Sequence, residues 1–267
     1  MIRSFFSGVS GLKSHQVRLD VTGNNIANVN TIGFKKGRVN FQDLLSQTIR
    51  EAKAVGEGAN PQQIGSGATI SSIDNVYTQG FSQTTDNPLD VMIQGDGFFV
   101  LTDANGNEYY TRVGSFGFDE SGNLINNAAK GFKVKGDTDL FLDDPEARSF
   151  NITSAGELKY TKDDGTIELI GTIQLVRFPN PAGLKKIGDN LFAATEISGT
   201  VGGGTAIEGT PGADGLGIIV PGALEMSNVD LSEEMTQMIT TQRGFQANAR
   251  TITVSDQFLE EVVNLKR

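Results

Sequence analysis

The sequence predicts an α+β fold, in which N- and C-terminal helices form a coiled-coil domain and a central all-β domain lies between them in the chain. Two patterns lead to this prediction. Apolar residues recur every three or four positions at both ends of the chain, as in a coiled-coil helix. Between about residue 90 and residue 180, alternating or short apolar runs are separated by glycine-containing turns, as in antiparallel strands. The chain has 267 residues, enough for one large or two modest domains.

The composition restricts the classes of function. Lys and Arg number 22 against 32 Asp and Glu, for a net charge of −10, and no basic stripe suggests nucleic-acid binding. The absence of cysteine excludes disulfides, thiolate metal sites and cysteine nucleophiles. No stretch reaches the roughly 18 apolar residues of a membrane span, and no A-x-A-like site follows the first residues. We therefore expect no membrane insertion and no cleavable secretory signal.

Residues 1–30 are predicted to form the first helix of the coiled-coil domain. Two stripes run along it. The apolar stripe consists of Ile2, Phe5, Val9, Leu12, Leu19 and Ile26, with Gln16 and Gly23 in the two remaining heptad positions. The small-residue stripe consists of Ser4, Gly8, Gly11 and Ser14. Because glycine costs about 1 kcal/mol inside a helix, two glycines in this stripe indicate that another backbone approaches closely.

The stretch NNIANVNTIGFKK, residues 24–36, follows directly. Asparagine and glycine favour turns, and asparagine side chains bond to nearby backbone, so we expect Asn28 to Gly33 to end the helix and turn the chain. Gly33 should take a positive φ or lie against a neighbouring backbone. Phe34 should anchor the following segment, and residues 31–70 are predicted to be a linker or an extended connecting segment. An ordinary helix C-cap loop is the simpler alternative.

Residues 71–225 are predicted to form the central β-domain. The dipeptides NG, SG, AG and DG mark four hairpin turns there. FGFDESGNL and FNITSAGEL share the spacing of Phe, Gly and Leu, which is consistent with a duplicated hairpin. Glycine-rich stretches at 50–70 and 198–216 read as linkers or long loops.

Residues 226–267 are predicted to form the second helix of the coiled-coil domain. Its seam consists of Leu231, Met235, Met238, Gln242, Phe245, Ala249, Ile252, Asp256, Leu259 and Val263. Asn228 or Asp230 is the expected N-cap, with Glu233 and Glu234 in the first turn. If the two seams pair, the ends of the chain meet. The alternative is two amphipathic helices packed on one globular core.

The sequence shows no catalytic constellation. His15 is the only histidine, which points to a surface or interface position rather than a metal site. Residues 103–108, DANGNE, carry Glu108 where a calcium loop needs glycine, and Gly114 where it needs glutamate, so we expect a hairpin turn. Residues 137–144 could hold a cation but read as a solvated loop. We predict no enzyme activity, no metal and no cofactor.

Long motifs resemble a known family. SGVSGLKSHQVRLDVTGNNIANVNTIGFKK resembles the N-terminal signature of the bacterial flagellar axial proteins, which form rod and hook. EMSNVDLSEEMTQMITTQRGFQANARTITVSDQFLEEVVNLKR resembles their closing helix. GDGFF and YYTRVGSFGFDESGNL resemble their first β-domain.

The resemblance implies an extracellular polymer subunit of the flagellum, with the helices as an inner coiled-coil tube and the β-domain as the outer shell. It also implies export without a cleaved signal peptide. The implied partners are further copies of the chain, rod and hook–filament junction proteins, the hook cap and the flagellar type III export apparatus. Self-assembly is then expected to depend on the coiled-coil seams and the family motif: Ile2, Phe5, Val9, Leu12, Leu19, Asn25, Ile26, Asn28, Gly33, Phe34, Leu231, Met235, Met238, Phe245, Ile252, Leu259 and Val263.

Two family members fit. The last residues, from Gln242 onward, look closer to hook endings, so we expect a hook subunit, part of the flexible joint between rod and filament. The alternative is a subunit of the distal rod, a straight drive shaft, because the segment 46–66 is about as long as in distal-rod proteins. An enzyme on a β-scaffold is a third interpretation, which the lack of a catalytic constellation argues against.

Overall fold

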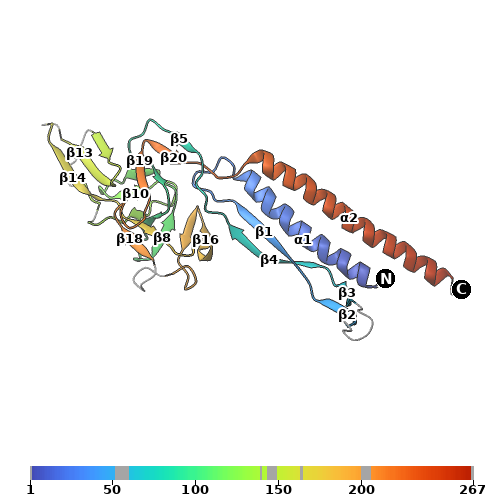
Figure 1. Cartoon of the computed structure of the whole chain (residues 1–267). Coiled ribbons are helices and arrows are strands. Elements are labelled where there is room, and N and C mark those ends of the chain that lie inside the picture. Colours follow the sequence, from blue (N-terminus) through green and yellow to red (C-terminus); the bar gives the residue numbers. More distant parts are fainter. Residues whose placement is uncertain are drawn as a thin grey trace. The chain divides into compact units, whose positions relative to one another are not determined.

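The computed structural model describes residues 2–51, 60–138, 140–142, 149–162, 165–199 and 206–265. The chain divides into two compact units, which are described separately. The helical unit comprises Met1–Ala27, Gly37–Val76 and Val229–Arg267, and the β-body comprises Asn28–Lys36 and Tyr77–Asn228. Two long helices and a large β-rich body confirm the α+β class (Figure 1).

The helical unit contains α1 (Ile2–Ala27) and α2 (Leu231–Asn264), which lie side by side (Figure 1). α2 begins at Asp230, whose side-chain oxygen accepts hydrogen bonds from the backbone N–H groups of Ser232 and Glu233, at 2.8 and 3.2 Å. Asp230 is therefore the N-cap, one of the two candidates from the sequence. Glu233 and Glu234 occupy the first turn, as predicted. Neither helix is long and apolar enough, over its described residues, to cross a membrane.

A two-stranded ribbon also belongs to the helical unit. β1 (Gly37–Asp43) pairs antiparallel with β4 (Ala68–Asn75), and β2 (Ser46–Arg50) pairs antiparallel with β3 (Gln62–Gly65). α1 contacts both β1 and β4, so it lies between α2 and this ribbon (Figure 1). Residues 31–70, expected to be a linker or an extended connecting segment, thus include the paired strands β1, β2 and β3 and the start of β4. These strands are mostly exposed, so no continuous apolar alternation marks them in the sequence.

The β-body is built around a sheet of nine strands in the described residues. They are β7 (Phe98–Thr102), β8 (Glu108–Thr111), β9 (Phe116–Phe118), β10 (Leu124–Asn126), β11 (Lys133–Val134), β15 (Leu175–Arg177), β16 (Lys185–Gly188), β17 (Leu191–Ala193) and β18 (Ile207–Gly209). The order is β16-β17-β8-β7-β11-β10-β9, and β15 pairs with both β7 and β18.

Smaller sheets complete the β-body. Their strands are β5 (Ser82–Thr84), β6 (Val91–Gln94), β12 (Ser149–Ile152), β13 (Glu157–Thr161), β14 (Ile167–Thr172), β19 (Ile218–Pro221) and β20 (Ala223–Glu225), and η1 (Pro181–Gly183) is a short 3-10 helix. β12, β13 and β14 form a three-stranded sheet, β19 pairs with β6, and β20 pairs with β5. The pairing of β5 with β20 brings together the two ends of the segment Tyr77–Asn228.

The core of the β-body lies on both faces of β7. Phe99 and Leu101 belong to the larger hydrophobic cluster, and Phe98 and Val100 belong to the smaller one. Successive side chains of a strand point to opposite faces, so FFVL contributes to both clusters. All four are buried, which is why this strand reads as a continuous apolar run rather than an alternation.

All four hairpin signals in the sequence are confirmed. They connect β7–β8, β9–β10, β12–β13 and β13–β14, and each turn carries one glycine with positive φ: Gly106 (82°), Gly122 (80°), Gly156 (82°) and Gly165 (75°). The two similar sequences make matching turns, because the N–H of Gly122 donates to the carbonyl of Asp119, and that of Gly156 donates to Thr153. The DANGNE stretch is the β7–β8 turn. Residues 137–144 and 198–216 lie partly outside the described residues.

Candidate assembly surface

Small residues form the contact between α1 and α2. A methyl group added at Gly11 would lie 2.7 Å from Nδ2 of Asn248, and one at Gly8 would lie 3.2 Å from Cγ1 of Ile252. On α2, a methyl group at Gly244 would lie 2.8 Å from Cε1 of His15. The two helices therefore approach closely where glycine removes the Cβ. This confirms the close approach that the small-residue stripe predicted.

A buried polar contact links the last turn of α1 to the first turn of α2. The Asn25 side chain donates to Oε2 of Glu234 at 3.1 Å and to the carbonyl of Gly37 at 2.9 Å. Its oxygen also accepts from the N–H of Gly37 at 2.9 Å. Asn25 and Glu234 are each 2% exposed. One asparagine thus joins the last turn of α1, the first turn of α2 and the start of β1.

His15 lies where three elements of the helical unit meet. Its ring is 5.8 Å from the ring of Phe41 on β1 and faces Gly244 on α2. Nδ1 is buried and has no hydrogen-bond partner among the described residues. Burial, followed by the nearby Arg18, lowers the pKa of His15. His15 was expected at a surface or at an interface, and the structure places it where α1 meets β1 and α2.

The described residues of the two predicted seams are half-buried or exposed in the single chain. On α1, Val9, Leu12, Leu19 and Ile26 are half-buried and Phe5 is exposed, while the side chain of Ile2 lies outside the described residues. On α2, Met238, Phe245 and Ile252 are half-buried, while Leu231, Met235, Leu259 and Val263 are exposed. Of the small-residue stripe, Gly8 and Gly11 lie against Ile252 and Asn248 of α2, whereas Ser14 donates to the Ala68 carbonyl on β4. Coiled-coil packing of the apolar stripes therefore stays a prediction.

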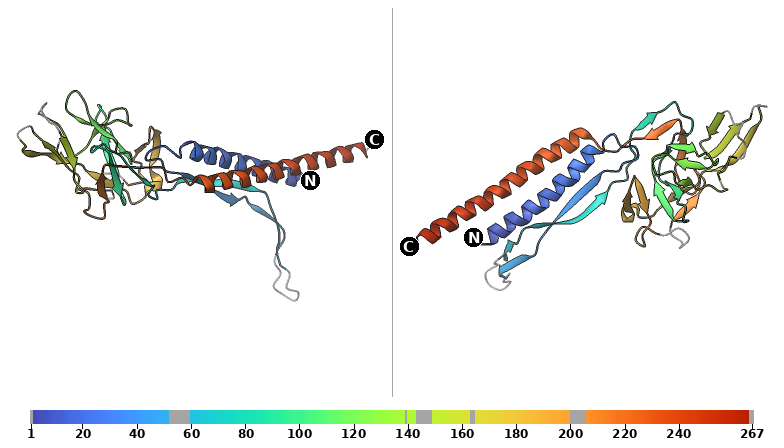
Figure 2. Two further views of the ribbon diagram at one scale, coloured as in Figure 1. Left: turned by 90° about the horizontal axis from the view of Figure 1, so that it is seen from above. Right: turned by 180° about the vertical axis from the view of Figure 1, so that it is seen from behind.

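A single chain leaves many large apolar side chains in water. We call this set the exposed apolar helix residues: Phe5, Phe6, Leu231, Met235, Ile239, Val254, Phe258, Leu259, Val262 and Val263. α2 runs past the N-terminus of α1 in every view (Figure 2), so its last turns have no helix beside them. Soluble monomers rarely expose extended apolar patches unless these are interaction sites. These residues are the best candidate for a surface that other chains cover.

The second candidate region is the anchor segment, residues 28–36, which belongs to the β-body. α1 ends at Ala27, and the Asn28 carbonyl accepts the N–H of Thr31 at 3.1 Å, closing a turn. Gly33 has φ +68°, and a methyl group there would lie 2.7 Å from Cγ2 and 3.2 Å from the backbone N of Val113. Both expectations for Gly33 are thus confirmed: the left-handed conformation and the close backbone.

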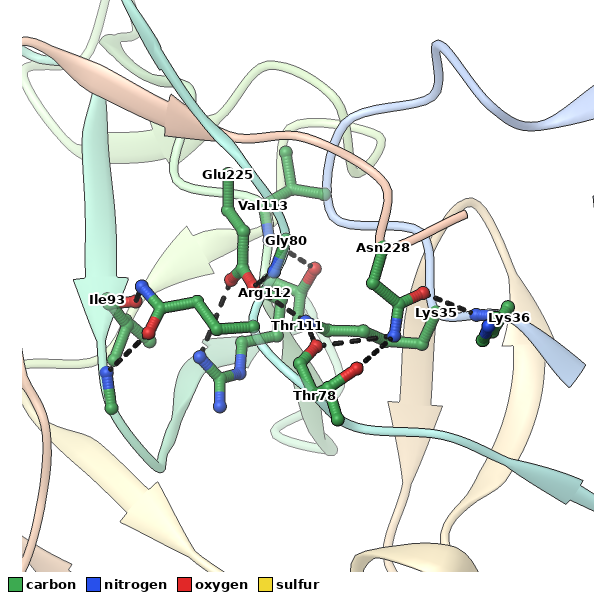
Figure 3. A network of polar contacts seen from close by, with 12 residues as sticks. Lys35, Lys36, Thr78, Gly80, Ile93, Thr111, Arg112, Val113, Glu225 and Asn228 are labelled. Atoms are coloured by element: carbon green, nitrogen blue, oxygen red, sulfur yellow. Dashed lines mark hydrogen bonds and ion pairs between the residues drawn. The ribbon is translucent and has the colours of Figure 1, made fainter. Parts of the chain in front are cut away.

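A buried charge cluster holds the anchor segment (Figure 3). Lys35 is 0% exposed, and its Nζ lies 2.6 Å from Oε1 of Glu225 and donates to the carbonyl of Thr78 at 2.8 Å. The same Oε1 accepts the N–H of Gly80, and Arg112 Nη1 lies 3.4 Å from Oε2 of Glu225. Burial lowers the pKa of Lys35, and the Glu225 carboxylate opposes that shift.

Contacts on both sides of Lys35 complete the anchor. Phe34 is buried, as expected, and Nζ of Lys186 lies 4.7 Å from its ring centroid. The N–H of Lys36 donates to the side chain of Asn228 at 2.8 Å. The residues expected from the sequence included Gly33 and Phe34 but not Lys35, Glu225 or Arg112. The only local signal was a lysine directly after Phe34, because the partners of Lys35, Thr78 and Glu225, lie 43 and 190 residues away.

The chemistry of these regions is packing and ion pairing. Within the described residues, no three His, Cys, Asp or Glu side chains gather in a group that could hold a metal ion.

Comparisons with known proteins match these regions. Three family models match: "Flagella basal body rod protein" at residues 6–35, "Flagellar hook protein FlgE/F/G D1 domain" at 92–168, and "Flagellar basal body rod FlgEFG protein C-terminal" at 220–265. The flagellar basal-body rod protein FlgG of Bacillus subtilis is 44% identical over 271 aligned positions, covering 100% of each chain.

Hook proteins also match, with a different coverage. The flagellar hook protein FlgE of Treponema pallidum is 55% identical over 139 residues, which cover 51% of this chain and 30% of the hook protein. The hook protein FlgE of Borreliella burgdorferi is 31% identical, but its alignment needs 448 positions to cover both chains. The rod protein therefore aligns length for length, whereas the hook proteins carry additional sequence.

Proposed function

The chain belongs to the bacterial flagellar axial protein family, the structural proteins of rod and hook, and from that premise we propose that it is a subunit of the distal rod. The family places it in the flagellum and implies polymerisation within the flagellar axis. It is a family of structural proteins rather than of enzymes.

The observation that carries the rod assignment is the alignment of the whole chain, end to end, with a rod protein. The hook subunit was the first expectation from the sequence, and the comparisons favour the rod alternative over it. The segment 46–66, likened in length to distal-rod proteins, supports the same choice. It forms β2 and β3, at the end of a ribbon that packs along α1. On β4 of the same ribbon, the Ala68 carbonyl accepts a hydrogen bond from the Ser14 hydroxyl of α1 at 3.2 Å.

Burial of the exposed apolar helix residues would drive assembly. Fully burying one large apolar side chain contributes about 1.5–3 kcal/mol, so a side chain that is half exposed contributes about 1 kcal/mol. Ten of them together only offset the estimated 4–15 kcal/mol cost of association. Each subunit therefore needs several neighbours. The last turns of α2 fit this arrangement, because Val254 and Phe258 lie on one side of the helix, whereas Leu259 lies about 100° around it from Phe258.

The proposed assembly also fits export through the flagellar type III apparatus without a cleaved signal peptide. Isolated helices are marginal in water, because nucleation is costly and packing supplies most of their stability. The helical unit would then be stable only within the polymer. The proposed partners are further copies of the chain, neighbouring rod and hook proteins and the export apparatus. A hook cap or hook–filament junction protein would be a partner only in a hook.

A hook subunit is the second candidate. The 55% identity with the Treponema hook protein over half of this chain favours it.

Electron microscopy of polymer assembled from the purified full-length chain separates the two candidates. The rod proposal predicts straight tubes that remain straight over a range of salt and pH. Tubes with uniform curvature would overturn the rod assignment in favour of the hook. A chain that stays monomeric at high concentration would contradict both.

A further inference from the structure

A small pocket of the β-body places two arginines against apolar walls. It has a volume of about 130 Å³ and is lined by Arg112 and Arg177, by one carboxylate, Asp96, and by apolar side chains that include Phe98 and Phe178. Pockets for drug-sized ligands measure roughly 300–1,000 Å³. This pocket therefore suits the end of one side chain rather than a whole small molecule.

The buried charge cluster beside the pocket, to which Arg112 belongs, carries an excess of positive charge. Arg112 is 3% exposed, and it shares the single carboxylate of Glu225 with Lys35, so two buried cations face one anion. Nε of Arg112 is buried and has no hydrogen-bond partner among the described residues. Figure 3 shows one guanidinium nitrogen turned away from Glu225. Buried charges are normally paired, so this surplus calls for an anion.

Asp96 does not fully supply that anion. Its Oδ2 lies 3.7 Å from Nε of Arg177, beyond hydrogen-bond distance. Its side chain is 69% exposed and that of Arg177 is 43% exposed, so the pair is solvated and weak. The Arg112 guanidinium carbon lies over the ring of Phe98, 5.3 Å from its centroid. A second carboxylate entering between the arginines would meet oriented donors in an apolar setting, the arrangement that strengthens arginine–carboxylate bonds.

We propose that this pocket, the arginine pocket, receives a carboxylate side chain from a second copy of this chain. Charge complementarity supports that occupant, because the chain carries 32 Asp and Glu against 22 Lys and Arg. The choice of a second copy rests on the proposed polymer. The carboxylate chemistry rests on the pocket alone, so the two parts are tested separately.

Arginine side-chain NMR of the monomeric full-length chain tests the chemistry, with propionate as the probe. The Nε–Hε signals of Arg112 and Arg177 should shift saturably with sodium propionate, and not with sodium chloride at equal ionic strength. Arg177→Gln should weaken propionate binding about tenfold, the loss of one charge-assisted hydrogen bond. Asp96→Asn should strengthen it about threefold, because it removes a like charge at the pocket. A propionate response equal to that of chloride, or no opposite effect of these variants, would overturn the carboxylate site.

Polymerisation tests the occupant. Arg177→Gln should raise the concentration needed for polymer formation severalfold. The matched control is Lys185→Gln, which removes one positive charge from an exposed position on β16 and should leave that concentration unchanged. Equal polymerisation of wild type and Arg177→Gln, with propionate binding weakened, would overturn the second copy as the source of the carboxylate. If the wild type does not polymerise, the rod proposal fails, while the NMR result still decides the chemistry.

Discussion

Replacing Lys35 by methionine removes one cation from the buried cluster with little change in side-chain volume. The ion pair with Glu225 at 2.6 Å and the hydrogen bond to Thr78 are lost. Breaking a buried pair by removing one partner costs about 3–5 kcal/mol. We expect the lower end of that range, because Glu225 keeps Arg112 and the N–H of Gly80. In a domain of this size, about 3 kcal/mol corresponds to a fall in Tm of about 6–12 °C.

Glu225→Gln should be worse than Lys35→Met, because it leaves two buried cations, Lys35 and Arg112, without a counter-charge. Thermal and urea unfolding of the β-body, followed by circular dichroism in dilute monomer, measures both variants. Lys185→Met, at an exposed position on β16, is the control and should stay within about 1 °C of the wild type. If Lys35→Met melts like this control, or if Glu225→Gln is the milder variant, residues 28–36 do not stabilise the β-body and the reasoning fails.

Three further predictions concern the helices and the turn. Gly33→Val should strain a φ of +68° and clash with Val113, costing about 1 kcal/mol or more, and should yield a secreted chain that polymerises poorly; normal filaments would contradict this. Gly11→Leu should separate α1 from α2 at Asn248 and stop tube formation, as seen by sedimentation, while Tm of the β-body stays unchanged. Phe245→Ala, about 3–5 kcal/mol for a phenylalanine fully buried in the polymer, should likewise block sedimenting polymer; a large fall in monomer Tm would instead show that the helix packs on the β-body.

Local sequence was sufficient for the turns and the helix ends. The four hairpin turns were predicted correctly, Asp230 was one of two predicted caps, and a positive φ was one of two expectations for Gly33. Each depends on the conformation of a few consecutive residues, and only glycine or a short polar side chain satisfies it at low cost. The small-residue stripe of α1 also predicted a close contact, because glycine destabilises a helix interior unless a close neighbour compensates.

Tertiary structure alone decided which charges are buried and which element lies against the glycines of α1. The small-residue stripe predicted a close neighbour, and the structure shows that α2 is the neighbour of Gly8 and Gly11. Lys35 and Glu225 are 190 residues apart, and the sequence around each residue does not indicate which residue it pairs with. The β1–β4 pairing was equally hidden, since ladder hydrogen bonds use backbone groups that every residue has. Local rules act over a few residues of chain, whereas ion pairs and ladders depend on distances that only the folded chain brings about.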